Sequence, residues 1–230
     1  MDPLILLTKA YEEGKIENRL YKNILERFRY VKDGITRIEK ASKILYPEYY
    51  IEPALVTSRS NNEQGILFAR TIPLVIDNRV RIVIEITAPL IIFGLKGTIH
   101  AILAHEFLHY LEFISRIIRM DIISDEISYT LFESKYLDTE RLLDARTVFN
   151  DRALIRLLER KMNGELNDER LKRKSIELWL GKGYPIKIIQ IEDNITRLPI
   201  DAIVNTPIDE GLESKIKDIL TRMKTRRKKG

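Results

Sequence analysis

Residues 100–113 read HAILAHEFLHYLEF and hold every histidine of the chain: His100, His105 and His109. No charged residue stands between Ile99 and Ala104. The pattern predicts a largely buried helix that Thr98 caps and that continues to about Met120. Because residues four positions apart lie one turn above each other on a helix, His105 and His109 share one of its faces.

His105-Glu106-Phe107-Leu108-His109 forms the motif HExxH. Two imidazoles one turn apart can bind one tetrahedral zinc ion at about 2.0–2.1 Å from each nitrogen. Glu106 is turned by about 100° and is long enough to reach a water on the open side of the metal as a general base. The other interpretation is a buried helix with histidines and no metal, which would bury costly polar groups. The motif therefore favours metal-assisted hydrolysis.

His100 stands five residues before His105, about 140° around the helix. It cannot join the same metal-binding face. We expect His100 to be a helix-start or surface residue.

Elements before the motif divide into helices and strands. Helical signals cover three segments, after which short β-branched runs and turn residues predict a small, mostly antiparallel sheet. In RVRIVIEIT the polar residues Arg79, Arg81 and Glu85 alternate, which predicts a strand with one solvated face. The predicted helices are 2–14, 16–31 and 36–45, and the strand runs are EPALVTSR, GILFAR, TIPLVI and RVRIVIEIT.

Further helices are expected after the motif, so the predicted fold class is α+β. The predicted helices cover residues 124–136, 138–161 (amphipathic), 168–180 (charged) and 210–222. The stretch YPIKIIQIED is predicted to be a strand, and residues 198–207 an irregular or extended connection. Four parts follow from this order: an N-terminal helical layer (1–48), a core with the sheet and the motif (49–162), a C-terminal extension (163–220) and a basic tail (221–230).

The net charge of +5 is concentrated at one end of the chain. The last nine residues, RMKTRRKKG, carry six lysines and arginines, and without them the net charge is −1. Such a tail can make a weak contact with nucleic acid or acidic lipid, and the alternative is a solvated terminus.

The chain has no cysteine, which excludes disulfides, thiolate zinc ligands and cysteine nucleophiles, and which fits a reducing compartment. No secretory signal is visible and no apolar run reaches the ~20 residues of a membrane span, so we expect a cytoplasmic protein. Abundant Ile, Lys, Arg and Glu are typical of thermophile proteins.

The stretch ILAHEFLHYL resembles the active-site helix of the zincin metallopeptidases. The order of a sheet, this helix and further helices is also similar, and the resemblance covers roughly residues 72–149. It implies a zinc-dependent metallopeptidase with a zincin-like fold, in which Glu106 takes the proton from the attacking water. It further implies a polypeptide substrate that pairs with an edge strand, either RVRIVIEIT or the neighbouring APLIIF.

The third zinc ligand has to come from outside the motif. The extended pattern HExxHxxGxxH is absent, since Glu112 and Ser115 occupy its glycine and third histidine positions. No histidine follows, which leaves a carboxylate. The candidates are Asp121, Asp125, Glu126, Glu133, Asp138, Glu140 and Asp144.

The string ERLLDART (140–147) resembles the ExxxD segment of gluzincins, as in HtpX-like membrane-associated metallopeptidases and small archaeal gluzincins. This resemblance implies that Glu140 is the third ligand and that Asp144 hydrogen-bonds a ligating histidine. Leu143 departs from it, because alanine is usual at that position. Glu133 is the second candidate for the ligand.

A different class of function is also compatible with the sequence. The chain could be a binding protein or a latent peptidase of zincin shape, in which the metal is structural or the cleft is permanently blocked. Residues 181–230 would then lie over the cleft as a latency segment or dock on a partner. The basic tail would then tether it to nucleic acid.

Overall fold

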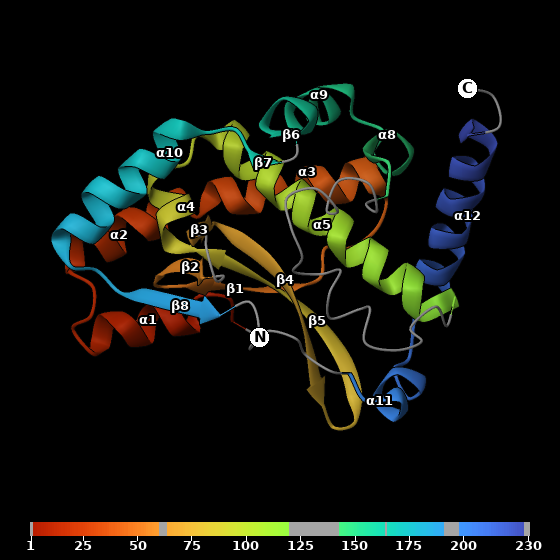
Figure 1. The fold of residues 1–230 in the computed structure, drawn as a ribbon, viewed down its shortest axis with the longest axis horizontal. Helices are drawn as coiled ribbons and strands as arrows, with labels where there is room; N and C mark the ends of the chain where they lie inside the picture. The colour runs from red at the N-terminus through yellow and green to blue at the C-terminus, as the bar shows by residue number, and fades with distance from the viewer. Residues whose placement is uncertain (1, 60–63, 120–142, 164, 191–197, 228–230) are drawn as a thin grey trace.

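The computed structural model describes residues 2–59, 64–119, 143–163, 165–190 and 198–227 (Figure 1). Over these residues the fold consists of helices, two small three-stranded sheets and one two-stranded hairpin, which is consistent with the predicted α+β class. Within the described residues, no helix has the length and apolar character needed to cross a membrane.

The N-terminal helices are α1 (Ile5–Glu12), α2 (Asn18–Arg27) and α3 (Arg29–Ser42). The predicted boundary between the second and third helices was wrong, because the chain turns at the buried Phe28 and not near Gly34. Gly34 lies inside α3, where a Cβ atom would come within 2.9 Å of the His100 and Leu103 side chains. The glycine therefore permits the close approach of α3 to the helix that carries the motif.

The first sheet has the strand order β1-β5-β4. Its strands are β1 (Glu48–Glu52), β4 (Ala69–Ile76) and β5 (Arg79–Thr87). β4 and β5 form an antiparallel hairpin, while β1 runs parallel to β5. Asp77 and Asn78 both have positive φ at the hairpin turn, as a tight two-residue turn requires.

RVRIVIEIT is β5, the central strand of this sheet, so its prediction as the substrate-binding edge was wrong. The solvated face predicted for it was only partly correct. Arg79 and Arg81 are exposed, whereas Glu85 is fully buried.

The second sheet has the strand order β3-β2-β8. Its strands are β2 (Leu55–Arg59), β3 (Gln64–Leu67) and β8 (Ile186–Gln190). β8 confirms the predicted strand in YPIKIIQIED, and it pairs in parallel with β2. The C-terminal extension thus completes a sheet of the core. Two sheets of mixed direction replace the single, mostly antiparallel sheet that we expected.

α4 (Ala88–Phe93) follows β5 directly, with Pro89 in its first turn, where proline's missing N–H removes no helical hydrogen bond. APLIIF is therefore helical, and its prediction as an extended strand was wrong. α5 (Lys96–Arg119) confirms the predicted long helix over the motif. Thr98 lies inside α5 and its hydroxyl donates to the Asp168 carboxylate (2.6 Å), so its prediction as the cap was also wrong.

The helix expected over 138–161 is interrupted. α8 (Ala145–Val148) and α9 (Arg152–Lys161) are separated by a non-helical stretch over 149–151, and Asp151 caps α9 by accepting from the Leu154 amide (2.9 Å). The predicted helix over 124–136 lies outside the described residues. β6 (Met162–Asn163) and β7 (Glu165–Leu166) form a small hairpin after α9.

The predicted helix over 168–180 corresponds to α10 (Glu169–Lys174), which continues as η1 (Ser175–Trp179) and η2 (Leu180–Lys182). Residues 198–207 contain a short helix, α11 (Ile200–Val204), where we expected irregular backbone. The final helix, α12 (Glu210–Arg227), extends into the residues predicted as a basic tail.

Candidate metal centre

α5 brings the two motif histidines together. The Nε2 atoms of His105 and His109 lie 3.0 Å apart, and their rings are perpendicular with centroids 4.6 Å apart. His105 is buried and His109 is half-buried. Two nitrogens bound to one tetrahedral zinc ion at 2.0–2.1 Å would be about 3.3 Å apart. The two imidazoles therefore fit a shared metal ion with only a small adjustment.

Phe107 holds this part of α5 in place. Phe107 stands between the two histidines in the sequence, its side chain is fully buried, and it stacks on Tyr46 with centroids 5.5 Å apart. The Tyr46 hydroxyl donates to the Leu103 carbonyl of α5 (3.0 Å). Burial and the nearby Glu106 carboxylate raise the pKa of Tyr46 well above its usual range, so this hydroxyl keeps its proton. Burying a phenylalanine side chain contributes about 1.5–3 kcal/mol, which stabilises the helix turn that carries the histidines.

Glu106 is buried, and its carboxylate contacts β4. The Thr71 hydroxyl lies 2.9 Å from Oε2 of Glu106 and 3.0 Å from the main-chain carbonyl of the same residue. One hydroxyl proton serves these two acceptors. The predicted general base is thus held by a strand that precedes it by 35 positions in the chain. Sequence reasoning missed Thr71, whose only signal was a polar residue in the apolar run TIPLVI.

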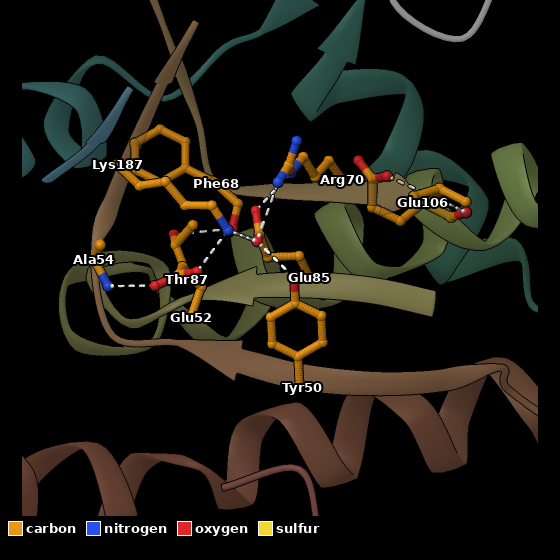
Figure 2. Close-up of polar contacts among 10 residues, drawn as sticks. Tyr50, Glu52, Ala54, Phe68, Arg70, Glu85, Thr87, Glu106 and Lys187 are labelled. Carbon is orange, nitrogen blue, oxygen red and sulfur yellow. Dashed lines mark hydrogen bonds and ion pairs between the residues drawn. The ribbon is translucent and has the colours of Figure 1, made fainter. Parts of the chain in front are cut away.

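Arg70, the neighbour of Thr71, points away from α5 into a buried ionic cluster (Figure 2). Its guanidinium donates to both carboxylate oxygens of Glu85, at 2.6 and 3.2 Å. Lys187 of β8 donates to Glu85 (2.6 Å) and to Glu52 (2.7 Å), and the Tyr50 hydroxyl donates to Glu85 (2.7 Å). Burial raises the pKa of Glu85, but the hydrogen bonds from Arg70, Lys187 and Tyr50 outweigh it and hold that pKa below its usual range.

This ionic cluster sets the register of β4. Tyr50, Glu85 and Arg70 stand directly opposite one another across β1, β5 and β4. Because neighbouring residues of a strand face opposite sides, fixing Arg70 toward Glu85 turns Thr71 toward α5. A slip of one residue would reverse both side chains and remove the contact with Glu106.

The predicted third ligand, Glu140, lies outside the described residues, as does the second candidate, Glu133. Within the described residues, no three histidine or carboxylate side chains gather as a metal-binding group. The choice between Glu140 and Glu133 stays a prediction.

Asp144 is described, and it begins α8. Its Oδ1 accepts from the Arg146 amide (2.9 Å) and its Oδ2 from the Thr147 hydroxyl (3.2 Å). The ψ angle of Asp144 is 116°, which is not helical. Asp144 is therefore not the last residue of a helical turn, as the resemblance to an ExxxD segment had led us to expect. The hydrogen bond from a ligating histidine to Asp144 stays a prediction.

His100 is not a surface residue, contrary to one of the two expectations. It is buried beside Gly34, and within the described residues its Nε2 atom has no hydrogen-bond partner. Burial first, and then the nearby Arg37 and Lys96, lower the pKa of His100 below its usual range. A neutral imidazole that packs α3 against α5 agrees with the prediction that His100 stands apart from the metal site.

The C-terminal residues reach the same helix. Ala202, Ile203, Ile216 and Ile219 are buried in the hydrophobic core, and α12 packs against α5 and α8. Burial and the charge of Asp209 raise the pKa of Tyr110, which follows His109, to about 12. Residues 198–227 are therefore integral to the fold, and removing everything after Gly181 would expose core residues.

Comparisons of the chain with protein-family models, with curated proteins and with solved structures found no match.

Proposed function

We propose that this protein is a zinc-dependent metallopeptidase of zincin type that hydrolyses peptide bonds. The observation that carries the proposal is the 3.0 Å approach of the His105 and His109 Nε2 atoms, with the Glu106 carboxylate buried on the next position of the same helix. A cysteine-free chain supports a reducing, cytoplasmic location.

His105 and His109 supply two ligands, and Glu140 is the proposed third. Bound zinc would polarise the substrate carbonyl and lower the pKa of a water to about 7. Glu106 takes a proton from the attacking water and passes it to the leaving amine. The Thr71 hydroxyl orients this carboxylate, because its hydrogen bond to Oε2 selects one rotamer of the glutamate.

The polypeptide substrate is proposed to bind along β4. This strand stands at an edge of the sheet order β1-β5-β4 and contacts α5. An extended peptide can pair with such an edge through main-chain hydrogen bonds, with side chains facing alternate sides. β4 takes the role that the sequence had assigned to β5 or to APLIIF.

The test compares metal content with cleavage of an unfolded test protein. The wild-type chain is expected to bind about one zinc per chain and to cleave. Glu106→Gln is expected to keep the zinc and lose cleavage by a factor of about 10² or more. Glu26→Gln, an exposed change on α2, is the matched control and should retain both.

Two results would contradict the proposal. Full cleavage by a metal-free preparation would exclude zinc chemistry. Stoichiometric zinc without cleavage of any polypeptide would instead favour the binding protein of zincin shape.

A further inference from the structure

α9 carries three arginines along its exposed side, Arg152, Arg156 and Arg160, which are called the arginine stripe here. Residues spaced by four advance only about 40° each, so the three lie within about 80° of arc. The opposite side of α9 buries Leu154 and Leu158, and this side packs toward α5. The packing of the leucines thus fixes the stripe facing outward.

The carboxylates nearest to the arginine stripe already have other cationic partners. Asp151 accepts from Arg37 of α3 (2.7 Å) and caps α9, while Glu159 accepts from Arg146 (2.7 Å). Across the described part of the chain, no carboxylate lies within ion-pair distance of Arg152, Arg156 or Arg160. The stripe therefore keeps a local excess of positive charge.

A hollow of about 380 Å³ opens beside the arginine stripe. Its polar lining consists of Arg146, the exposed Asn150, Arg152 and Arg156, together with the carboxylates of Asp151 and Glu159. These two carboxylates are already paired with Arg37 and Arg146, so the guanidinium groups of Arg152 and Arg156 keep their positive charge uncompensated there. An anion in this hollow would meet guanidinium groups from both α8 and α9. α12 lies beside α8 (Figure 1) and carries the exposed Lys224.

We propose that the arginine stripe binds the phosphodiester backbone of nucleic acid. Successive stripe residues are about 6 Å apart along a rigid helix, which suits a chain of regularly spaced charges. The planar guanidinium donates two parallel hydrogen bonds to a phosphate, a geometry that lysine lacks. Phe149, the aromatic residue at the hollow, is buried and cannot stack on a base. The contact is with the backbone and is independent of base sequence.

The test measures binding of a fluorescent 24-nucleotide single strand and a 24-base-pair duplex of mixed sequence by anisotropy, from 25 to 300 mM salt. The stripe variant is Arg152→Gln, Arg156→Gln and Arg160→Gln combined. Removing three phosphate contacts should lower the slope of log K against log salt by about 2–3 and weaken binding at least ten-fold at 50 mM salt. The variant should keep the wild-type melting temperature within a few degrees, because all three side chains are exposed.

The matched control removes three exposed positive charges from α1 and α2, as Lys9→Gln, Arg19→Gln and Lys22→Gln combined. For this variant, the slope of log K against log salt should stay within one unit of the wild-type slope. Equal losses in the two variants would overturn the proposal, since they would report net charge alone.

A third variant locates the binding. If Arg222→Gln, Lys224→Gln, Arg226→Gln and Arg227→Gln together abolish binding while the stripe variant keeps it, the end of α12 is the binding site and the stripe is not. Tighter binding to poly-glutamate than to either nucleic acid would assign the surface to acidic polypeptides and would equally overturn the proposal. None of these readouts depends on zinc or on cleavage.

Discussion

The hydroxyl of Thr71 on β4 lies 2.9 Å from Oε2 of Glu106 on α5, and both residues are buried. The contact joins a sheet edge to the second residue of the HExxH motif. It orients a carboxylate that water cannot freely surround. In the proposed peptidase, a hydrogen bond therefore links the edge strand that binds the substrate to the carboxylate that moves the proton.

Thr71→Val should slow cleavage by about ten-fold or more, because a hydrogen bond to a charged group contributes about 1.5–3 kcal/mol and valine keeps the shape of the side chain. Thr71→Ser, which retains the hydroxyl, should stay close to wild type. Zinc content should remain at about one per chain in both variants. The measurement is the specific activity on an unfolded test protein at fixed zinc occupancy. Equal activity of the valine and serine variants would show that Thr71 does not position Glu106.

Glu140→Ala should lower the zinc content from about one per chain to well below that, because a catalytic zinc site with two protein ligands lacks its usual third. Glu133→Ala should leave the zinc content unchanged. Metal analysis after dialysis against a weak chelator measures both. Zinc loss in the second variant alone would move the third ligand to Glu133.

Glu85→Ala should destabilise the fold by about 3–5 kcal/mol, because it leaves Arg70 and Lys187 without their shared buried carboxylate. Urea unfolding at pH 7 measures this change in the free energy of unfolding. Glu13→Ala, which removes an exposed carboxylate that pairs with Lys15 at the surface, is the control and should leave the free energy of unfolding close to the wild-type value.

The lowered pKa of Glu85 adds a pH dependence to this prediction. A carboxyl whose folded pKa lies below its unfolded value stabilises the fold above the unfolded pKa, and the contribution is lost as the pH falls through the folded pKa. The difference in stability between wild type and Glu85→Ala should therefore narrow below about pH 4.5. A difference that stays constant down to pH 3 would contradict this account.

His100→Gln should reduce the amount of folding stability that the protein loses when the pH falls from 8 to 5. The folded pKa of His100 is below 6.5, so the unfolded state takes up the proton first and wild-type stability falls as the pH drops through and below that value. Thermal unfolding from pH 8 to pH 5 in a chelator compares the two proteins, with His105 and His109 present in both. The advantage of wild type over the variant should shrink toward pH 5, and a constant advantage would contradict the burial of a neutral imidazole.

The local patterns that predicted correctly were those in which one segment contains the whole signal. The apolar helix around HEFLH, the shared face of His105 and His109, and the strand in YPIKIIQIED all depend on spacing within a few turns or residues. The predictions that failed depended on neighbours. APLIIF has a strand-like composition, yet Pro89 starts a helix that packs between α2 and α10, and tertiary packing overrides a weak local preference.

Glu85 shows the same limit most clearly. Its alternation with Arg79 and Arg81 predicted a solvated face, but Arg70 and Lys187 arrive from β4 and from a strand about a hundred residues later, and their charges make its burial possible. Thr71 was unrecognised for the same reason, since its partner lies in another element.

The sequence by itself determined the two imidazoles and the carboxylate of HExxH, because one helical turn is enough to place them on adjacent faces. Only the tertiary structure decided that β4 is the edge strand beside them, that Arg70 and Glu85 fix its register, and that Thr71 therefore meets Glu106. These relationships join residues that are 15 and 35 positions apart in the chain. Such contacts form only when separate elements pack around a common core, and no local pattern of side chains records which elements will meet.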